Sequence, residues 1–322
     1  MMGVAKRMKI SHEAVLFAIL VGSILMLSIQ SDRFLTVDNL LNQVRLIAEV
    51  GLVALPMTMI IITGGIDLSV GSIMGLCTIV LGYSWKILGF PLEMAIIFTL
   101  LIGSFAGALN SIFITRVKVP PLIMTLATLT FYRGLAEGIS KARSVRGYPE
   151  WFYFLGQGDY WGIPTQVFVL ALAILIFGFV VSKTSFGRSL YAIGHNETGA
   201  MFSGVPVNKI KVAIYTLSGL MSGVAAVVFV SRVSTTRSDM GSGLELDVIA
   251  AVILGGASIF GGIGTIKGTV LGFLLIQLLK NGLSLTGVKG DATIMVIGLV
   301  LIVTILITNL LEKYSSKDSS VS

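Results

Sequence analysis

The sequence predicts an all-α polytopic membrane protein with about ten transmembrane helices. Among its 322 residues, 55% are hydrophobic and only 12% are charged, and the mean hydropathy is +0.94. Soluble domains carry about 25% charged residues, so a large soluble domain is excluded. The apolar residues also fall into runs of about 20, which is the length of helix that crosses a bilayer.

Each expected span is an apolar run bounded by charges, glycine or proline. We place the spans at residues 14–30, 46–64, 67–83, 92–115, 120–140, 163–182, 211–231, 246–262, 265–285 and 291–311. The first run follows three basic residues, as a secretory signal does, but it lacks a small-residue cleavage site and is interpreted as a retained helix. The chain then divides into an N-terminus at 1–13, a transmembrane domain at 14–311 and a polar, disordered tail at 312–322.

The basic residues predict the orientation of the chain. They cluster before the first span and in the long loop 183–210, where few acidic residues dilute them. Because cytoplasmic loops are enriched in Lys and Arg, we expect this loop and both termini to lie in the cytoplasm. The net charge of +7 then comes from basic residues in cytoplasmic loops beside the membrane lipid. Nucleic acid is not expected as a partner. The aromatic loop 141–162 would lie outside, either as an interfacial anchor or as a docking surface.

A glycine-rich interruption follows the second span. It reads Thr63-Gly-Gly-Ile-Asp-Leu-Ser-Val-Gly-Ser72, and paired glycines weaken a helix and let backbones approach closely. Asp67 has two interpretations here. It can cap the following helix, whose N-terminal N–H groups favour an acceptor, or it can line a permeation path, because broken helices at membrane depth often border cavities.

A second glycine cluster lies 191 residues downstream, at 254–264. Gly255 and Gly256 match Gly64 and Gly65, which indicates a two-fold internal pseudo-repeat. Interrupted segments in corresponding halves point to a transporter site. The spans also carry neutral polar side chains such as Asn110, and together these allow a path for an uncharged, hydroxyl-rich solute.

The chain lacks the residues of an energy source or an enzyme. Few charges lie within the spans, and Arg133 and Glu137 are four apart, so on one helix face they are expected to pair. An ion-driven carrier usually shows carboxylates or histidines inside its spans. There is no phosphate-binding G-x-x-x-x-G-K-[ST] motif, no hydrolase or metalloprotease motif, and one cysteine, Cys77. We therefore predict no catalytic residue, no metal site and no cofactor.

The loop 183–210 contains a short predicted helix. Asn196 is placed to cap a helix over about 197–203, and Gly204 with Pro206 would end it. A short helix between two spans can dock into a groove on a soluble partner, although an ordinary connector fits the pattern equally well.

At these residues the chain resembles the membrane subunits of ABC importers for ribose, xylose, arabinose, related sugars and autoinducer-2. The resemblance covers nearly the whole chain and rests on Gly64-Gly-Ile-Asp-Leu-Ser-Val-Gly-Ser72, Lys118-Val-Pro-Pro-Leu-Ile-Met-Thr-Leu126, Gly187-Arg188 through Gly194-His-Asn196, Ser203-Gly-Val205, and Leu254-Gly-Gly256 through Gly261-Gly262. It implies that 196–205 is a coupling helix seated on a separate ATPase subunit. The residues expected to carry this contact are Asn196, Glu197, Gly199, Ala200, Ser203, Gly204 and Val205.

The resemblance implies a permease subunit in a bacterial plasma membrane. Its further partners would be an external substrate-binding protein and a second permease, either a copy of this chain or a related one, and the partner ATPase would use the ATP. The residues expected along the translocation pathway or its gate are Gly64, Gly65, Asp67, Ser69, Asn110, Gly255 and Gly256. The alternative function is an ion-coupled secondary transporter of a small neutral solute.

Overall fold

The computed structural model describes residues 12–288, 292–293, 295–296, 298–299 and 302. This part of the chain is mainly helical, with two short antiparallel pairings of strands and irregular connections. The helices are α1 (His12–Gln30), α2 (Val37–Ile62), α3 (Val70–Lys86), α4 (Leu92–Ile112) with the π-helical turn η1 (Phe113–Val117), α5 (Pro121–Ser140), α6 (Glu150–Gln157), α7 (Thr165–Lys183), α8 (Ser185–His195), α9 (Glu197–Phe202), α10 (Val207–Val233), α11 (Leu244–Leu254) and α12 (Ile266–Leu285). The strands are β1 (Val145–Arg146), β2 (Asp159–Tyr160), β3 (Ile163–Pro164) and β4 (Thr235–Thr236).

The four short strands of the described residues form two antiparallel pairs, one between distant segments and one within a single connection. β1 pairs antiparallel with β4, with Val145 opposite Thr236, and β2 pairs antiparallel with β3. The first pairing joins the segment after α5 to the segment after α10. It therefore fixes two connections that are far apart in sequence at one end of the molecule.

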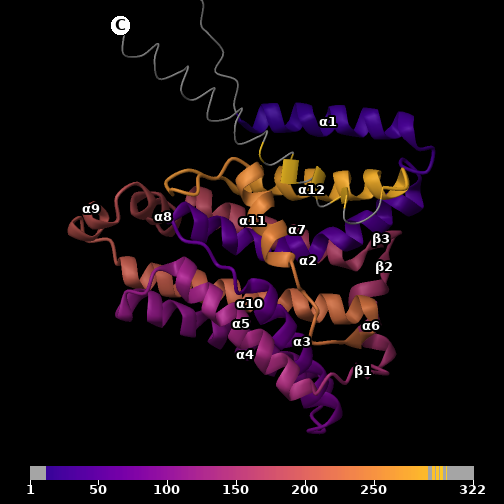
Figure 1. Ribbon diagram of the computed structural model, residues 1–322, viewed down its shortest axis with the longest axis horizontal. Coiled ribbons are helices and arrows are strands. Elements are labelled where there is room, and N and C mark those ends of the chain that lie inside the picture. Colours follow the sequence, from indigo (N-terminus) through magenta and orange to yellow (C-terminus); the bar gives the residue numbers. More distant parts are fainter. Residues whose placement is uncertain (1–11, 289–291, 294, 297, 300–301, 303–322) are drawn as a thin grey trace, which may run out of the picture.

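Figure 1 shows the long helices running between two ends of the molecule. The short helices α8 and α9 lie at one end, called here the α9 end, and α6 with β1, β2 and β3 lies at the other, called the α6 end. Helix α1 covers α12 on one side, and α3, α4 and α5 form the opposite side. Helix α10 packs on α2, α3 and α4 between these layers.

Six helices in the described part of the chain are long and apolar enough to cross a membrane. They are α1, α2, α4 with η1, α7, α10 and α12. The chain is therefore an all-helical multi-pass membrane protein, as predicted, but the expected count of about ten is not reached among the described residues. The predicted span 291–311, apart from scattered positions, and the predicted tail 312–322 lie outside these residues.

Two predicted spans differ in the structure. The segment 246–262 is the 11-residue helix α11 followed by an irregular glycine-rich connection, so it is not one spanning helix. The segment 67–83 begins with non-helical backbone, and α3 starts only at Val70. Apolar composition predicted both spans. An irregular segment that is buried in protein can have the same apolar composition as a spanning helix, so composition does not separate the two.

Helix α2 forms the centre of the packing. Its most apolar stretch is 83% buried, whereas that of α1 is 17% buried. Since the side chains of α1 are apolar on every face, the exposed ones, including Phe17 and Leu25, suit contact with lipid chains. Burial thus separates a central helix from a peripheral one, although both have the composition of a transmembrane helix.

Candidate functional site: a broken segment between two helices

The segment 63–69 connects α2 to α3 without helical structure, and it holds a fully buried carboxylate. Asp67 has no exposed surface. Its Oδ1 accepts hydrogen bonds from the Ser69 backbone N–H at 3.0 Å and the Ser69 hydroxyl at 2.6 Å, and its Oδ2 accepts one from the Ser218 hydroxyl of α10 at 3.0 Å. A buried carboxylate is costly unless it is hydrogen-bonded. These three donors stabilise the break in the chain.

The network extends from Asp67 across two further helices. The Asn110 side-chain amide of α4 donates to the Ser69 hydroxyl at 2.8 Å, and the Tyr132 hydroxyl of α5 donates to Asn110 Oδ1 at 3.2 Å. Three predicted pathway residues, Asp67, Ser69 and Asn110, are thus brought together. Asp67 bonds to the residue two positions on, as in a turn, and Ser69 is the residue that precedes α3.

The two glycine clusters also meet, but through residues other than those predicted. The Gly262 N–H donates to the Ile62 carbonyl at 2.8 Å, next to Gly64. A Cβ atom at Gly194 of α8 would collide with the Ile62 carbonyl, so three chain segments approach closely here. Close packing against the first cluster requires glycine at Gly261 and Gly262, and a pseudo-repeat is not confirmed.

Gly255 and Gly256 lie away from Asp67. Gly255 packs against Gly268 of α12, and Gly256 lies beside the His12 ring of α1. Their small size allows close contact with α12 and α1. They do not contact the network around Asp67. The structure therefore separates these two residues from the other predicted pathway residues.

Helix α9 forms as the sequence predicts. Asn196 Oδ1 accepts a hydrogen bond from the Gly199 N–H at 2.8 Å, and the chain leaves the helix through Gly204 at φ +85°. Ala200 is buried, whereas Met201 is 56% exposed and Phe202 is 83% exposed. These two exposed apolar side chains were not among the predicted docking residues. Their position directly before the turn at Gly204 was the feature of the sequence that could have indicated them.

An ion pair connects α9 to the long helix α10. Lys211 Nζ lies 2.7 Å from Glu197 Oε2. Both side chains line a cavity of about 110 Å³ that Gly64 and Gly65 also border. Tyr215 lies on the same wall, and its buried hydroxyl has no hydrogen-bond partner among the described residues. The cavity therefore places α9 next to the segment that leads to Asp67.

A second contact at the α9 end joins α8 to the connection between α11 and α12. The Tyr191 hydroxyl donates to the Gly264 carbonyl at 2.7 Å. Burial raises the pKa of Tyr191, so this hydroxyl keeps its proton and remains a donor at neutral pH. The α8 and α9 pair is thus attached to both irregular segments.

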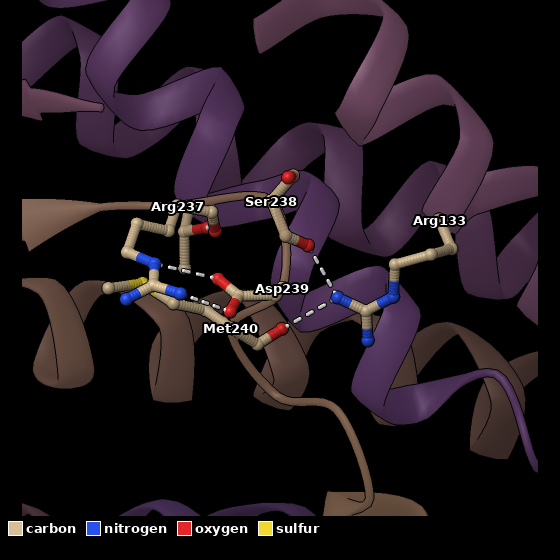
Figure 2. Close-up of polar contacts among 6 residues, drawn as sticks. Arg133, Arg237, Ser238, Asp239 and Met240 are labelled. Carbon is tan, nitrogen blue, oxygen red and sulfur yellow. Dashed lines mark hydrogen bonds and ion pairs between the residues drawn. The ribbon is translucent and has the colours of Figure 1, made fainter. Parts of the chain in front are cut away.

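Arg133 of α5 binds backbone rather than the predicted carboxylate. Its Nη1 donates to the carbonyls of Ser238 at 2.5 Å and Met240 at 2.9 Å (Figure 2). Its Nη2 lies 3.4 Å from the Gly71 carbonyl. No ion pair with Glu137 forms in the described structure, so the predicted pairing is wrong. Helical spacing indicated a shared face, but the guanidinium extends instead to the carbonyls of the irregular segment 237–243.

The segment 237–243 returns from the α6 end into the molecule before α11 begins. It is anchored by the β1–β4 pairing at one end and by Arg133 in the middle. Figure 2 shows Arg237 paired with Asp239 on the same segment, with Nε to Oδ1 at 2.9 Å. Irregular backbone at membrane depth needs such partners, because lipid supplies none.

Two further ion pairs involve α2, α10, α11 and α12. Arg232 Nε lies 2.8 Å from Glu49 Oε1, and Lys280 Nζ lies 2.6 Å from Asp247 Oδ2. The sequence indicates that few charges lie within the spans, but it does not identify the partners of Glu49 and Lys280. Over the described residues, no three His, Cys, Asp or Glu side chains come together as a metal site.

Comparison with known proteins identifies the family. Residues 39–305 match the family model described as "Branched-chain amino acid transport system / permease component". The chain is also similar to proteins named "Autoinducer 2 import system permease protein LsrD" from Escherichia coli (strain K12), Shigella flexneri and Escherichia coli O157:H7. Identity to each is 37% over 305 residues, which cover 93% of this chain and 92% of the relative. No solved structure matches the chain. The family model and the named relatives both match most of the length of the chain. The chain therefore belongs to this family of permease components of ABC importers.

Proposed function

We propose that this chain is the permease subunit of an ATP-driven importer that takes up autoinducer 2 or a related sugar. The observation that carries the proposal is the connection of the capped helix α9 to the broken segment at Asp67. The relatives with 37% identity are named as permeases of autoinducer 2 import, which supports the solute class. The neutral hydroxyl and amide groups around Asp67 also suit a solute that carries hydroxyl groups.

A separate ATPase subunit would dock on α9 and hydrolyse the ATP. Phe202 and Met201 offer an exposed apolar contact beside a rigid cap, as helix-in-groove recognition requires. Movement of α9 would reach segment 63–69 through the pair of Glu197 with Lys211 and the cavity shared with Gly64. Access would then switch between the two sides of the membrane by a rigid-body shift of packed elements. The chain itself would need no cofactor.

The other partners follow from the orientation. With the α9 end in the cytoplasm, both termini would be cytoplasmic and the α6 end would face the external substrate-binding protein. Aromatic side chains at that end, including Trp151 and Trp161, are exposed and suit a docking surface or the membrane interface. A second permease, identical or related, would complete the pathway.

The test uses the importer reconstituted in proteoliposomes with its ATPase and binding protein. Gly204→Arg is expected to abolish ATP-dependent uptake and ATPase association, because any side chain at φ +85° strains the turn that ends α9. Gly89→Arg is the matched control. Gly89 also has positive φ, with nothing within 4 Å of an added Cβ, but it follows α3, far from α9.

Normal ATP-dependent uptake by the Gly204→Arg variant would contradict the coupling role of α9. A second arm uses Ala200→Trp, which places a bulky group at a buried position of the same helix. Uptake by the purified chain alone, driven by an ion gradient without the ATPase, would instead establish the ion-coupled transporter.

A further inference from the structure

A charged cavity lies between α2, α10 and α11, distinct from the network around Asp67. It has a volume of about 200 Å³, and its wall includes Glu49, Arg232 and Asp247. Gly241 and Ser242 border it from the segment that Arg133 holds, and Leu244 borders it from the start of α11. The cavity is large enough for several water molecules.

The charges around this cavity retain unused hydrogen-bonding capacity. Arg232 donates to Glu49 through Nε alone, and no acceptor in the described part of the chain binds its two terminal nitrogens. Asp247 accepts from Lys280 through Oδ2 only, which leaves its other oxygen for a ligand. The side chains of Arg232 and Asp247 are 21% and 29% exposed, so their free atoms are accessible to a ligand in the cavity.

The location of the charges also points to function. Glu49 lies near the midpoint of α2, and its side chain is 6% exposed, while that of Arg232 is 21% exposed. Ionisable residues within membrane segments are expensive, and they usually face a cavity or a solute pathway. An apolar pair of similar volume would often stabilise the fold equally well, so stability does not explain the charges.

We propose that this cavity is a binding site through which a small polyhydroxylated solute passes during import, with Glu49, Arg232 and Asp247 as its hydrogen-bonding residues. The proposal rests on the proposed importer function and adds the residues that recognise the solute. Carboxylate oxygens accept hydrogen bonds from adjacent hydroxyl groups, and guanidinium nitrogens donate to hydroxyl or carbonyl oxygens. Entry would be beside Ser242 and Gly243, which are exposed.

The first experiment measures import by the full reconstituted importer with ribose, xylose, arabinose and autoinducer 2 as probes. Glu49→Gln and Asp247→Asn keep the side-chain volume and remove the charge. Each is expected to raise the KM for the transported probe by about 10-fold to 100-fold, the equivalent of one hydrogen bond to a charged group. Glu13→Gln is the matched control, since Glu13 of the peripheral helix α1 accepts a hydrogen bond from Thr265 at 3.2 Å, away from the cavity, and its KM should be unchanged.

The second experiment tests occupancy directly. The native Cys77 is buried, so a Ser242→Cys variant provides one reactive thiol at the mouth of the cavity. A saturating concentration of the transported probe should slow maleimide labelling of this thiol in the reconstituted importer. In the Glu49→Gln background, protection should require a proportionally higher concentration.

The outcomes separate this inference from the importer function. An unmodified importer that takes up none of the probes with ATP would contradict the proposed function. Uptake by the unmodified importer together with unchanged KM values in both variants and no protection at Ser242→Cys would overturn the cavity site alone. Assembly of each variant with the ATPase, measured by co-purification, identifies a variant that has lost its fold, and the labelling experiment then decides.

Discussion

Glycine determines how closely α4 and α10 approach. A Cβ atom at Gly107 would collide with the backbone carbonyl of Tyr215, and one at Gly219 would collide with the carbonyl of Gly103. The two backbones are therefore in direct contact, as small residues allow between membrane helices. This contact positions Asn110 on α4 opposite Ser218 on α10, so the network around Asp67 depends on it.

At this scale we predict that Gly107→Ala destabilises the protein by about 1–3 kcal/mol, because the added methyl group overpacks a tight contact. A lower midpoint of thermal unfolding in detergent would show it. Gly134→Ala on α5 is the control, since nothing lies within 4 Å of an added Cβ there, and alanine favours helix. Equal midpoints for the two variants would contradict the role of Gly107.

Arg133 links two elements, the helix α5 and the irregular segment 237–243. The guanidinium satisfies the carbonyls of Ser238 and Met240, which have no helical partners. The segment also borders the charged cavity through Ser242. Its position therefore determines the shape of that cavity, although Arg133 itself is not among the lining residues.

For this pair of elements we predict that Arg133→Met loosens segment 237–243. Two carbonyls would lose their donor, at a cost of about 1–3 kcal/mol each. A Ser238→Cys thiol should then react faster with maleimide in the Arg133→Met background than in the unmodified one. Arg133→Lys retains a donor and should give an intermediate rate, and identical rates in all three backgrounds would argue against the contact.

The sequence could predict the long helices, but not whether lipid or protein surrounds each apolar segment. Helices α4, α7 and α12 match their expected ranges closely, because an apolar run between charged ends has one interpretation in a bilayer. The predicted spans 246–262 and 67–83 are also apolar runs, yet α11 has only 11 residues and the backbone before α3 is irregular. No single-sequence pattern distinguishes these two environments.

The candidate site was predictable to the extent that local rules define it. The Asn196 cap and the turn at Gly204 depend on neighbouring residues and were identified. Partners such as Arg232 for Glu49, separated by 183 positions, depend on the tertiary fold and were not. Arg133 illustrates the same limit, since its helical spacing to Glu137 favoured a pair that the approach of a distant segment replaced.

For the whole molecule we predict that the α6 end faces the outside and the α9 end the cytoplasm, and two variants that each add one exposed cysteine to the buried Cys77 test this. Trp161→Cys lies at the α6 end and Phe202→Cys at the α9 end, and the two native side chains are 96% and 83% exposed. A membrane-impermeant maleimide added to intact cells should label Trp161→Cys alone, and permeabilised cells should label both. Labelling of Phe202→Cys in intact cells would reverse the proposed orientation.

The position of α1 has a consequence for biogenesis. Its buried face of Leu16, Leu20 and Leu27 packs on α12, where a Cβ at Gly282 would meet Leu27. The ribosome completes α1 at Gln30 and reaches α12 at Ile266, and at about 5–20 residues per second the delay is on the order of 10 to 50 s. During that time helix α1 lies in the bilayer without α12. Its largely apolar surface makes this unpacked intermediate compatible with contact with lipid on all sides.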